Sequence, residues 1–207
     1  MSRKVLIGMF MTLDGIAAIV ESPDTTPGAG DDVWDAMWGT HREDVDTMLL
    51  GRNTFEGWSQ FWPTQLDSPD PQMRNFARFS DRIEKIVFSR TLKDTTWSNS
   101  RIVRGPIEEE IPRLRALPGK NMIVGGGVGF VQSLLASHQA DELSLAVVPS
   151  IVGHGRSVFR LALDPAQHRD QVPLGAPDRH DFQLLEARGL KSGVVYLRYG
   201  LPAPTRA

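Results

Sequence analysis

Met122-Ile123-Val124-Gly125-Gly126-Gly127-Val128-Gly129-Phe130 is the stretch that says most about the fold of this chain. It begins as a short apolar strand, and residues 128–135 have helical spacing. Three consecutive glycines between a strand and a helix let the backbone approach a ligand at the carboxyl edge of a sheet, where open α/β sheets bind ligands. Phe130 stands where the Rossmann fingerprint has its third glycine, so this turn is of another kind. The alternative is that these glycines only allow close packing under the helix.

Other short apolar runs predict further strands of the same sheet. Residues 4–10 are apolar on both faces, as in an interior strand. Between the strands lie segments with helical spacing, and this alternation is typical of a largely parallel sheet. The strands are expected at 4–10, 47–50, 85–88 and 121–124; the helices are expected at 72–79, 107–117 and 128–135, with a weaker one at 31–42.

The last part of the chain has a different pattern. A strand is predicted at 143–148, and a proline-punctuated loop at 164–179 follows it. Two more strands, at 182–188 and 194–199, are joined by a hairpin-like turn. We therefore expect an α/β fold with a mostly parallel mixed sheet and an antiparallel C-terminal hairpin. Residues 1–200 are expected to form one domain and 201–207 a flexible tail.

The composition excludes several classes of protein. Hydrophobic residues make up 41% of the 207 residues, which is typical of a globular chain. The formal charge of −2 offers no general field for nucleic acid, and no apolar run is suited to a membrane span. The absence of cysteine excludes disulfides and thiolate chemistry. Because Asp14-Gly15 interrupts the apolar start early, a signal peptide is not expected and the cytoplasm is the predicted compartment.

Two more strand ends carry groups that suit phosphate. Gly51-Arg52-Asn53-Thr54 leads from a predicted strand into a helix start, where free N–H groups and a guanidinium can hold a diphosphate. Ser89-Arg90-Thr91 follows another strand and suits a phosphate monoester such as the 2′-phosphate of NADP. The alternative for the first turn is a glycine that permits a tight turn beside a solvated arginine.

Three further residue patterns bear on the chemistry. The five histidines show no metal-ligand spacing, so no metal site is predicted. The chain has no Gly-x-Ser-x-Gly motif, which forms the nucleophile elbow of serine hydrolases, so that enzyme class is not favoured. Four tryptophans cluster in the first third of the chain, and core packing is their commoner role, although Trp34 or Trp38 could wall a pocket. These tryptophans are Trp34, Trp38, Trp58 and Trp62.

Five segments of the chain resemble the dihydrofolate-reductase-like family. They are the turns at 51–54, 89–91 and 125–127, the early stretch Met11-Thr12-Leu13-Asp14-Gly15, and residues 141–155. The resemblance covers roughly residues 3–200. It is closest to the branch related to the reductase domain of bacterial riboflavin biosynthesis, the C-terminal domain of the bifunctional deaminase-reductase. It implies helices on both faces of the sheet.

The resemblance also implies roles for individual residues. The residues implied to bind NADPH are Gly51, Arg52, Thr54, Ser89, Arg90, Thr91, Gly125, Gly126 and Gly127. Asp35 has the placement of the carboxylate that binds the pterin in dihydrofolate reductases, and we predict it as the catalytic residue, with Asp31 and Asp32 as weaker substitutes. A pocket beside Trp34 and Phe10 would desolvate that carboxylate and make it a usable acid. Asp14 and Trp34 are predicted to bind substrate.

The sequence thus predicts an NADPH-dependent reductase that transfers a hydride to a small pterin-like or pyrimidine-like heterocycle. Two departures bear on the substrate: Ile16 replaces the lysine usual in riboflavin-type reductases, and an insertion occupies residues 22–32. The alternative is a module of the same fold that binds NADPH without turnover. Dimers are common among the resembling proteins, so a homodimer is expected, with residues 143–148 as a candidate contact.

Overall fold

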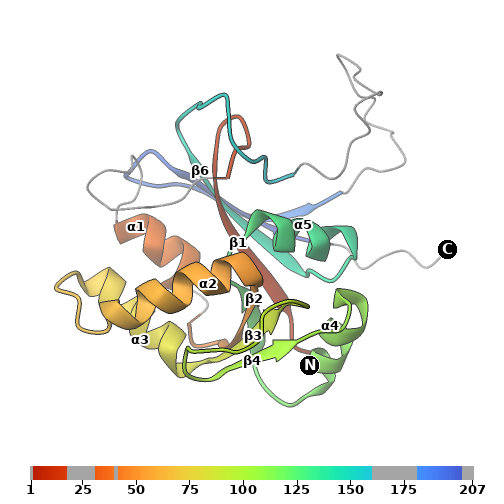
Figure 1. Ribbon diagram of the computed structural model, residues 1–207. Coiled ribbons are helices and arrows are strands. Elements are labelled where there is room, and N and C mark those ends of the chain that lie inside the picture. The colour runs from red at the N-terminus through yellow and green to blue at the C-terminus, as the bar shows by residue number, and fades with distance from the viewer. Residues whose placement is uncertain (1, 18–30, 40–41, 160–180, 202–207) are drawn as a thin grey trace.

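We describe the fold from a computed structural model of the chain, over residues 2–17, 31–39, 42–159 and 181–201 (Figure 1). The first half contains β1 (Val5–Thr12), α1 (Asp31–Trp34), the π-helical turn η1 (Asp35–Gly39), β2 (Val45–Gly51), α2 (Arg52–Phe61), the 3-10 turn η2 (Trp62–Gln65), α3 (Pro71–Arg82) and β3 (Glu84–Phe88). The second half contains β4 (Ser100–Val103), α4 (Ile107–Ala116), β5 (Asn121–Val124), α5 (Val128–Ala136), β6 (Glu142–Val148), β7 (Gln183–Gly189) and β8 (Val195–Gly200).

The eight strands of the described residues form one sheet in the order β4-β3-β2-β5-β1-β6-β8-β7. The strands from β4 to β6 in this order pair in parallel. β8 then runs antiparallel to β6, and β7 antiparallel to β8. The predicted α/β class, the mostly parallel mixed sheet and the antiparallel C-terminal hairpin are therefore confirmed.

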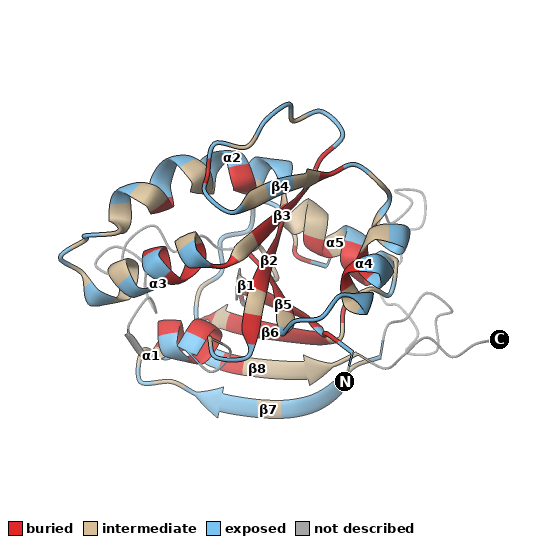
Figure 2. Cartoon of the chain, turned by 90° about the horizontal axis from the view of Figure 1, so that it is seen from below, coloured by how far each residue is buried: buried red, intermediate tan, exposed pale blue. Residues whose placement is uncertain are grey.

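Side chains on the two faces of the sheet build two cores, because successive residues of a strand point to opposite faces. Leu6 and Met48 face a cluster formed with α1, η1, α2 and α3. Ile7 and Leu49 face a second cluster formed with α4 and α5. Helices thus cover both faces (Figure 1), as predicted, and the central strands are buried while β7 is exposed at one edge (Figure 2).

Local sequence signals account for two helix starts that shape the site. The carboxylate of Asp70 accepts hydrogen bonds from the N–H groups of Gln72 (2.8 Å) and Met73 (3.4 Å), and so caps α3. α5 has no side-chain cap; it begins after Gly127, whose φ of 88° favours glycine. Its first N–H groups are therefore left for a ligand or for solvent.

Two expectations about elements need correction. β4 was not predicted, because it is a short edge strand that begins with the polar residues Ser100 and Arg101. The helix expected at 31–42 is shorter: one α-helical turn passes into a π-helical turn that ends at Gly39.

Other expectations stay predictions. Residues 143–148, the candidate dimer contact, lie in β6 between β1 and β8. The loop predicted at 164–179 and residues 202–207 of the predicted tail lie outside the described residues. Leu201, the first residue of that tail, is described, and its N–H donates to the carbonyl of Asp141 at 2.8 Å.

Candidate functional site

Three strand ends meet at the carboxyl edge of the sheet, because β2 lies between β3 and β5. Gly51 at the end of β2 pairs with Phe88, the last residue of β3, and Leu49 of β2 pairs with Val124 of β5. The turns at 51–54, 89–91 and 125–127 are therefore neighbours. Nη1 of Arg52 donates to Oγ1 of Thr91 at 3.3 Å, which joins the first two turns directly.

The three glycines of the 125–127 turn have different surroundings. A Cβ on Gly125 would lie 2.7 Å from a methyl of Leu50 and 2.9 Å from the ring of Trp58, so this glycine is needed for packing. Gly126 has φ of +74° and faces open space, with nothing within 4 Å of a Cβ position. Gly127 has φ of +88° and faces Thr54. Packing and ligand approach therefore belong to different residues of one turn.

The turn after β3 is held by hydrogen bonds to its own backbone. Oγ of Ser89, which is buried, accepts from the N–H groups of Thr91 (3.3 Å) and Leu92 (2.9 Å). Arg104 donates to the carbonyls of Arg90 (3.1 Å) and Leu92 (2.9 Å). Arg90 is exposed. Sequence reasoning missed Arg104, because it follows β4, the one strand that was not predicted.

A cavity of about 530 Å³ opens beside the glycine turn. Its walls come from β1, the α1–η1 segment, α2, η2, α3 and the turn itself. The lining includes Gly126 and Gly127, Asn53 and Thr54, and the aromatic residues Phe10, Trp34, Trp38, Trp58, Trp62 and Phe76. Trp34 thus lies where the sequence analysis expected it. No Asp or Glu lines the cavity within the described part of the chain.

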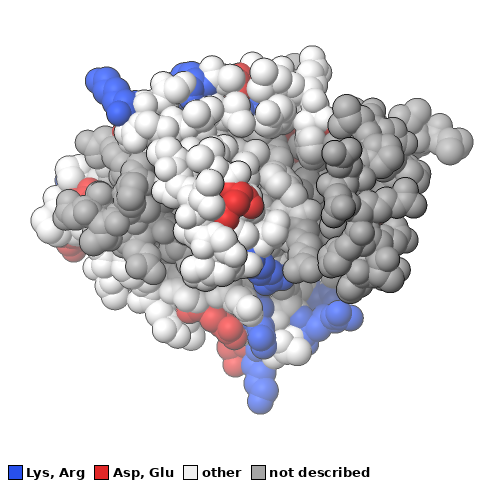
Figure 3. All heavy atoms as spheres, turned by 90° about the horizontal axis from the view of Figure 1, so that it is seen from above, with Lys and Arg blue, Asp and Glu red and all other residues white. Residues whose placement is uncertain are grey.

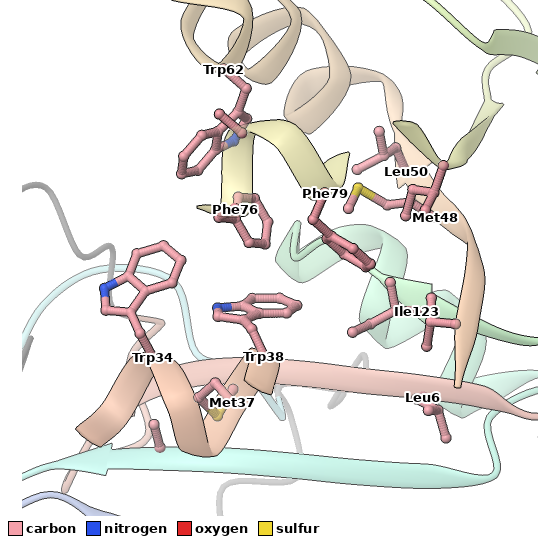
Figure 4. Close-up of a cluster of buried hydrophobic side chains, with 14 of the residues drawn as sticks. Leu6, Trp34, Met37, Trp38, Met48, Leu50, Trp62, Phe76, Phe79 and Ile123 are labelled. Carbon is pink, nitrogen blue, oxygen red and sulfur yellow. The ribbon is translucent and has the colours of Figure 1, made fainter. Parts of the chain in front are cut away.

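The aromatic wall is a cluster centred on Phe76 (Figure 4). The Phe76 ring lies 5.5 Å from Trp34, 5.2 Å from Trp38 and 4.4 Å from Trp62, measured between ring centroids. These three tryptophans are at least nine-tenths buried, so the core role predicted for them coexists with a place on the cavity wall. Their indole N–H groups are buried without a hydrogen-bond partner.

One more lining residue, Arg156, comes from a flap formed by residues 12–17 and 150–158. The N–H of Ala17 donates to the carbonyl of Arg156, and the N–H of Val158 donates to the carbonyl of Gly15, both at 2.9 Å. The two segments lie side by side at the top of Figure 1. Arg156 is exposed, and its Nη2 would lie 3.0 Å from a Cβ on Gly129 in the first turn of α5. Sequence reasoning missed it because its neighbourhood depends on this long-range pairing.

Asp14 holds the flap together. Its carboxylate accepts from the hydroxyl of Thr12 (2.5 Å) and from the N–H of Gly153 (2.8 Å). The Thr12 hydroxyl, and after it the Gly153 N–H, lower the pKa of Asp14 below its ordinary value of 3.8. Asp14 does not line the cavity in the structure.

The predicted acid lies outside the cavity. Asp35 begins η1, and its side chain is exposed rather than desolvated beside Trp34 and Phe10. The burial that would raise the pKa of a catalytic acid is therefore not observed at Asp35. Asp32 is engaged elsewhere: its carboxylate accepts from the N–H of Lys191 at 2.7 Å, which ties α1 to the β7–β8 turn.

The surroundings of the site are mostly uncharged. Figure 3 looks down on the carboxyl edge, and most of the described surface in that view is neither acidic nor basic. Within the described ranges no group of three or more His, Asp or Glu residues could hold a metal ion. In the same ranges, every helix is too short or too polar to cross a membrane.

The sheet order and the antiparallel C-terminal strands define a dihydrofolate-reductase-like α/β fold. The chain matches the RibD C-terminal domain family over residues 3–195, and it belongs to that family. It is 25% identical to the uncharacterized protein YyaP of Bacillus subtilis (strain 168) over 202 residues, covering 95% of this chain and 94% of YyaP.

Solved structures share the fold at lower identity. A candidate riboflavin biosynthesis protein from Shewanella sp. PV-4 is 17% identical, with a TM-score of 0.63 and coverage of 98% of this chain and 99% of its own. The dihydrofolate reductase of Enterococcus faecalis, solved in complex with NADP(H), is 14% identical, with a TM-score of 0.54 and 96% coverage of both chains. The predicted family and fold are thereby confirmed.

Proposed function

We propose that this protein is an NADPH-dependent reductase that transfers a hydride to a small heterocycle of the pterin-like or pyrimidine-like kind. The proposal is carried by one observation: three turns whose groups suit phosphate lie at the same sheet edge as an aromatic cavity. Such an edge is where open α/β sheets bind nucleotides. The family match and the NADP(H) complex of a structural neighbour support the same cofactor.

The residues present fit a dinucleotide phosphate. Gly126 leaves open space beside the start of α5, so a diphosphate could approach the backbone there without a side chain in the way. Thr54 of α2 faces Gly127 in the same turn, and Arg52 begins that helix. The Ser89-Arg90-Thr91 turn, joined to Arg52 through Thr91, would bind the 2′-phosphate.

When bound, the nicotinamide supplies the hydride, and the protein has to orient the acceptor and exclude water. The tryptophan wall suits a planar ring, because aromatic faces stack on one another. With no carboxylate on the described lining, we infer that the proton comes from solvent rather than from a positioned acid. The same absence favours the second candidate function, a module that binds NADPH without turnover.

The decisive experiment is a screen of the purified protein for NADPH oxidation with dihydrofolate, other pterins, flavins and pyrimidine intermediates. Turnover of any of these supports the reductase. NADPH binding without turnover favours the binding module, and failure to bind NADPH at all overturns both. The homodimer also stays a prediction, to be checked by sedimentation analysis of the same preparation.

A further inference from the structure

The charge on the cavity lining is of one sign. Arg156 is the only charged side chain among the described residues that line the cavity. A guanidinium can only donate hydrogen bonds. A ligand that complements Arg156 must therefore bring an acceptor, and a cationic ligand would meet the charge of Arg156 without a described carboxylate to compensate.

The flap places Arg156 beside the start of α5. The N–H of Ala17 donates to the carbonyl of Arg156, and Nη2 of Arg156 would lie 3.0 Å from a Cβ on Gly129 in the first turn of α5. The side chain is exposed, so its guanidinium is accessible to a ligand. Arg52 lies at the start of α2 and donates to Thr91, so Arg156 offers an anion contact of its own.

We propose that the cavity binds a planar ligand that carries negative charge, and that Arg156 is the residue that pairs with this charge. The inference rests on the proposed function, because it concerns the same cavity. The negative group has two sources: the diphosphate of the cofactor, or an anionic substituent on the substrate ring. Both present the same oxygen chemistry to a guanidinium.

The test compares Arg156→Gln and Arg156→Lys with the wild type, using Arg113→Gln as the control. Arg113 is an exposed arginine of α4 that pairs only with Glu109 and Glu110 of its own helix in the described structure. Calorimetric titrations use NADPH, and then flavin mononucleotide and riboflavin as planar rings with and without a phosphate. Circular dichroism confirms that each variant is folded.

We expect Arg156→Gln to weaken binding of the anionic ligand by about 10-fold or more, since a hydrogen bond to a charged group contributes about 1.5–3 kcal/mol. Arg156→Lys should recover part of the loss, and Arg113→Gln should bind like the wild type. Weaker NADPH binding identifies the cofactor diphosphate as the partner. Unchanged NADPH binding with a loss for flavin mononucleotide, but not for riboflavin, identifies a substrate anion.

The inference is overturned if Arg156→Gln binds NADPH and flavin mononucleotide as the wild type does, or if the wild type binds none of the three probes. The first result leaves the proposed function standing. A wild type that binds flavin mononucleotide through Arg156 but does not bind NADPH would instead overturn the proposed function and retain this inference.

Discussion

Oγ1 of Thr54 lies 2.5 Å from the position that a Cβ atom would take on Gly127, whereas nothing lies within 4 Å of the corresponding position on Gly126. The start of α2 thus closes on one glycine of the turn and leaves its neighbour open. A side chain on Gly126 would project into the space assigned to the diphosphate, while one on Gly127 would collide with protein.

We therefore predict that Gly126→Val abolishes NADPH binding while the protein stays folded. Its φ of +74° is unfavourable for a side chain, so we expect a loss of stability of about 1–3 kcal/mol as well. Gly193→Val in the β7–β8 turn, with φ of +83° and only an ordinary contact to Pro149, controls for that strain. Titration with NADPH and thermal melting separate the two effects, and normal binding by Gly126→Val would leave packing as the role of the turn.

Arg90 is predicted to set the preference for NADPH over NADH. We expect the wild type to bind NADPH at least about 10-fold more tightly, because a guanidinium paired with a phosphate contributes about 1.5–3 kcal/mol. Arg90→Ala should reduce this ratio mainly by weakening NADPH, since NADH lacks the 2′-phosphate. Fluorescence titration with both nucleotides measures it, and equal wild-type affinities would remove Ser89 and Arg90 from the role.

The strands that were predicted correctly are those whose sequence carries the signal by itself. β1, β2, β3 and β5 are apolar runs buried on both faces, and their bounds agree with the prediction within about two residues. β4 has no such signal, because it is a partly polar edge strand. Its extended conformation depends on pairing with β3. η1 is likewise beyond local patterns, because its π-helical turn depends on how Trp38 and Met37 pack on the sheet.

The candidate site also has one part that the sequence predicts and another that it does not. The turns at 51–54, 89–91 and 125–127 could be predicted because each follows a recognisable strand, and parallel strands end at the same edge. Arg156 could not, because its place on the cavity depends on pairing between segments about 140 residues apart, as in the bond from Gly153 to Asp14. Asp35 was assigned by resemblance alone, and the fold leaves its side chain in solvent.

Glu142 is predicted to stabilise the fold at neutral pH and to lose that effect in acid. Burial opposes its ionisation, but hydrogen bonds from Lys4 (2.8 Å) and Arg198 (3.0 Å) outweigh burial and lower its pKa below 4.5. The unfolded chain therefore takes up the proton first as pH falls. The contribution is complete above about pH 4.5 and disappears as pH falls through the lower native pKa.

Glu142→Gln should thus cost about 1–2 kcal/mol at pH 7, as expected for charge-assisted bonds to partly exposed partners. The difference from the wild type should shrink below pH 4.5. Urea unfolding at several pH values measures both, with Glu108→Gln on the exposed surface of α4 as the control. A difference that does not vary with pH would show that the carboxylate acts by shape rather than by charge.

Lys85 is predicted to make stability rise with pH in the alkaline range. It is fully buried, and its Nζ donates to the carbonyls of Ser80 (2.6 Å) and Ile83 (2.8 Å) near the end of α3. Burial lowers the pKa of Lys85 from 10.5 to about 8, against the opposing charge of Asp81. Between these two values the unfolded chain holds a proton that the native protein has released, so stability increases with pH.

The rise should appear from about pH 8 to 10.5 in the wild type and be absent in Lys85→Met. The exposed Lys93 gives the matched control, Lys93→Met, which should keep the wild-type slope. Chemical unfolding at each pH provides the free energies. Parallel profiles for the wild type and Lys85→Met would mean that the three carbonyl contacts, including that of Asp81, hold the ammonium charged throughout.

The final prediction concerns Asp35 and the origin of the proton. Because Asp35 is exposed and no described carboxylate lines the cavity, we expect Asp35→Asn to keep NADPH affinity unchanged and turnover within about threefold of the wild type. A positioned acid would be worth roughly 10²–10⁴ in rate. A carboxylate in the first turn of a helix instead contributes about 0.3–1 kcal/mol to stability through the helix dipole.

Single-turnover rates with a substrate from the screen, measured for both proteins across pH, separate these roles. A small drop in melting temperature with an unchanged rate would make the helix-start role sufficient. A rate loss of 10² or more that recovers at low pH would restore Asp35 as the catalytic acid and require α1 and η1 to bring it to the ligand on binding.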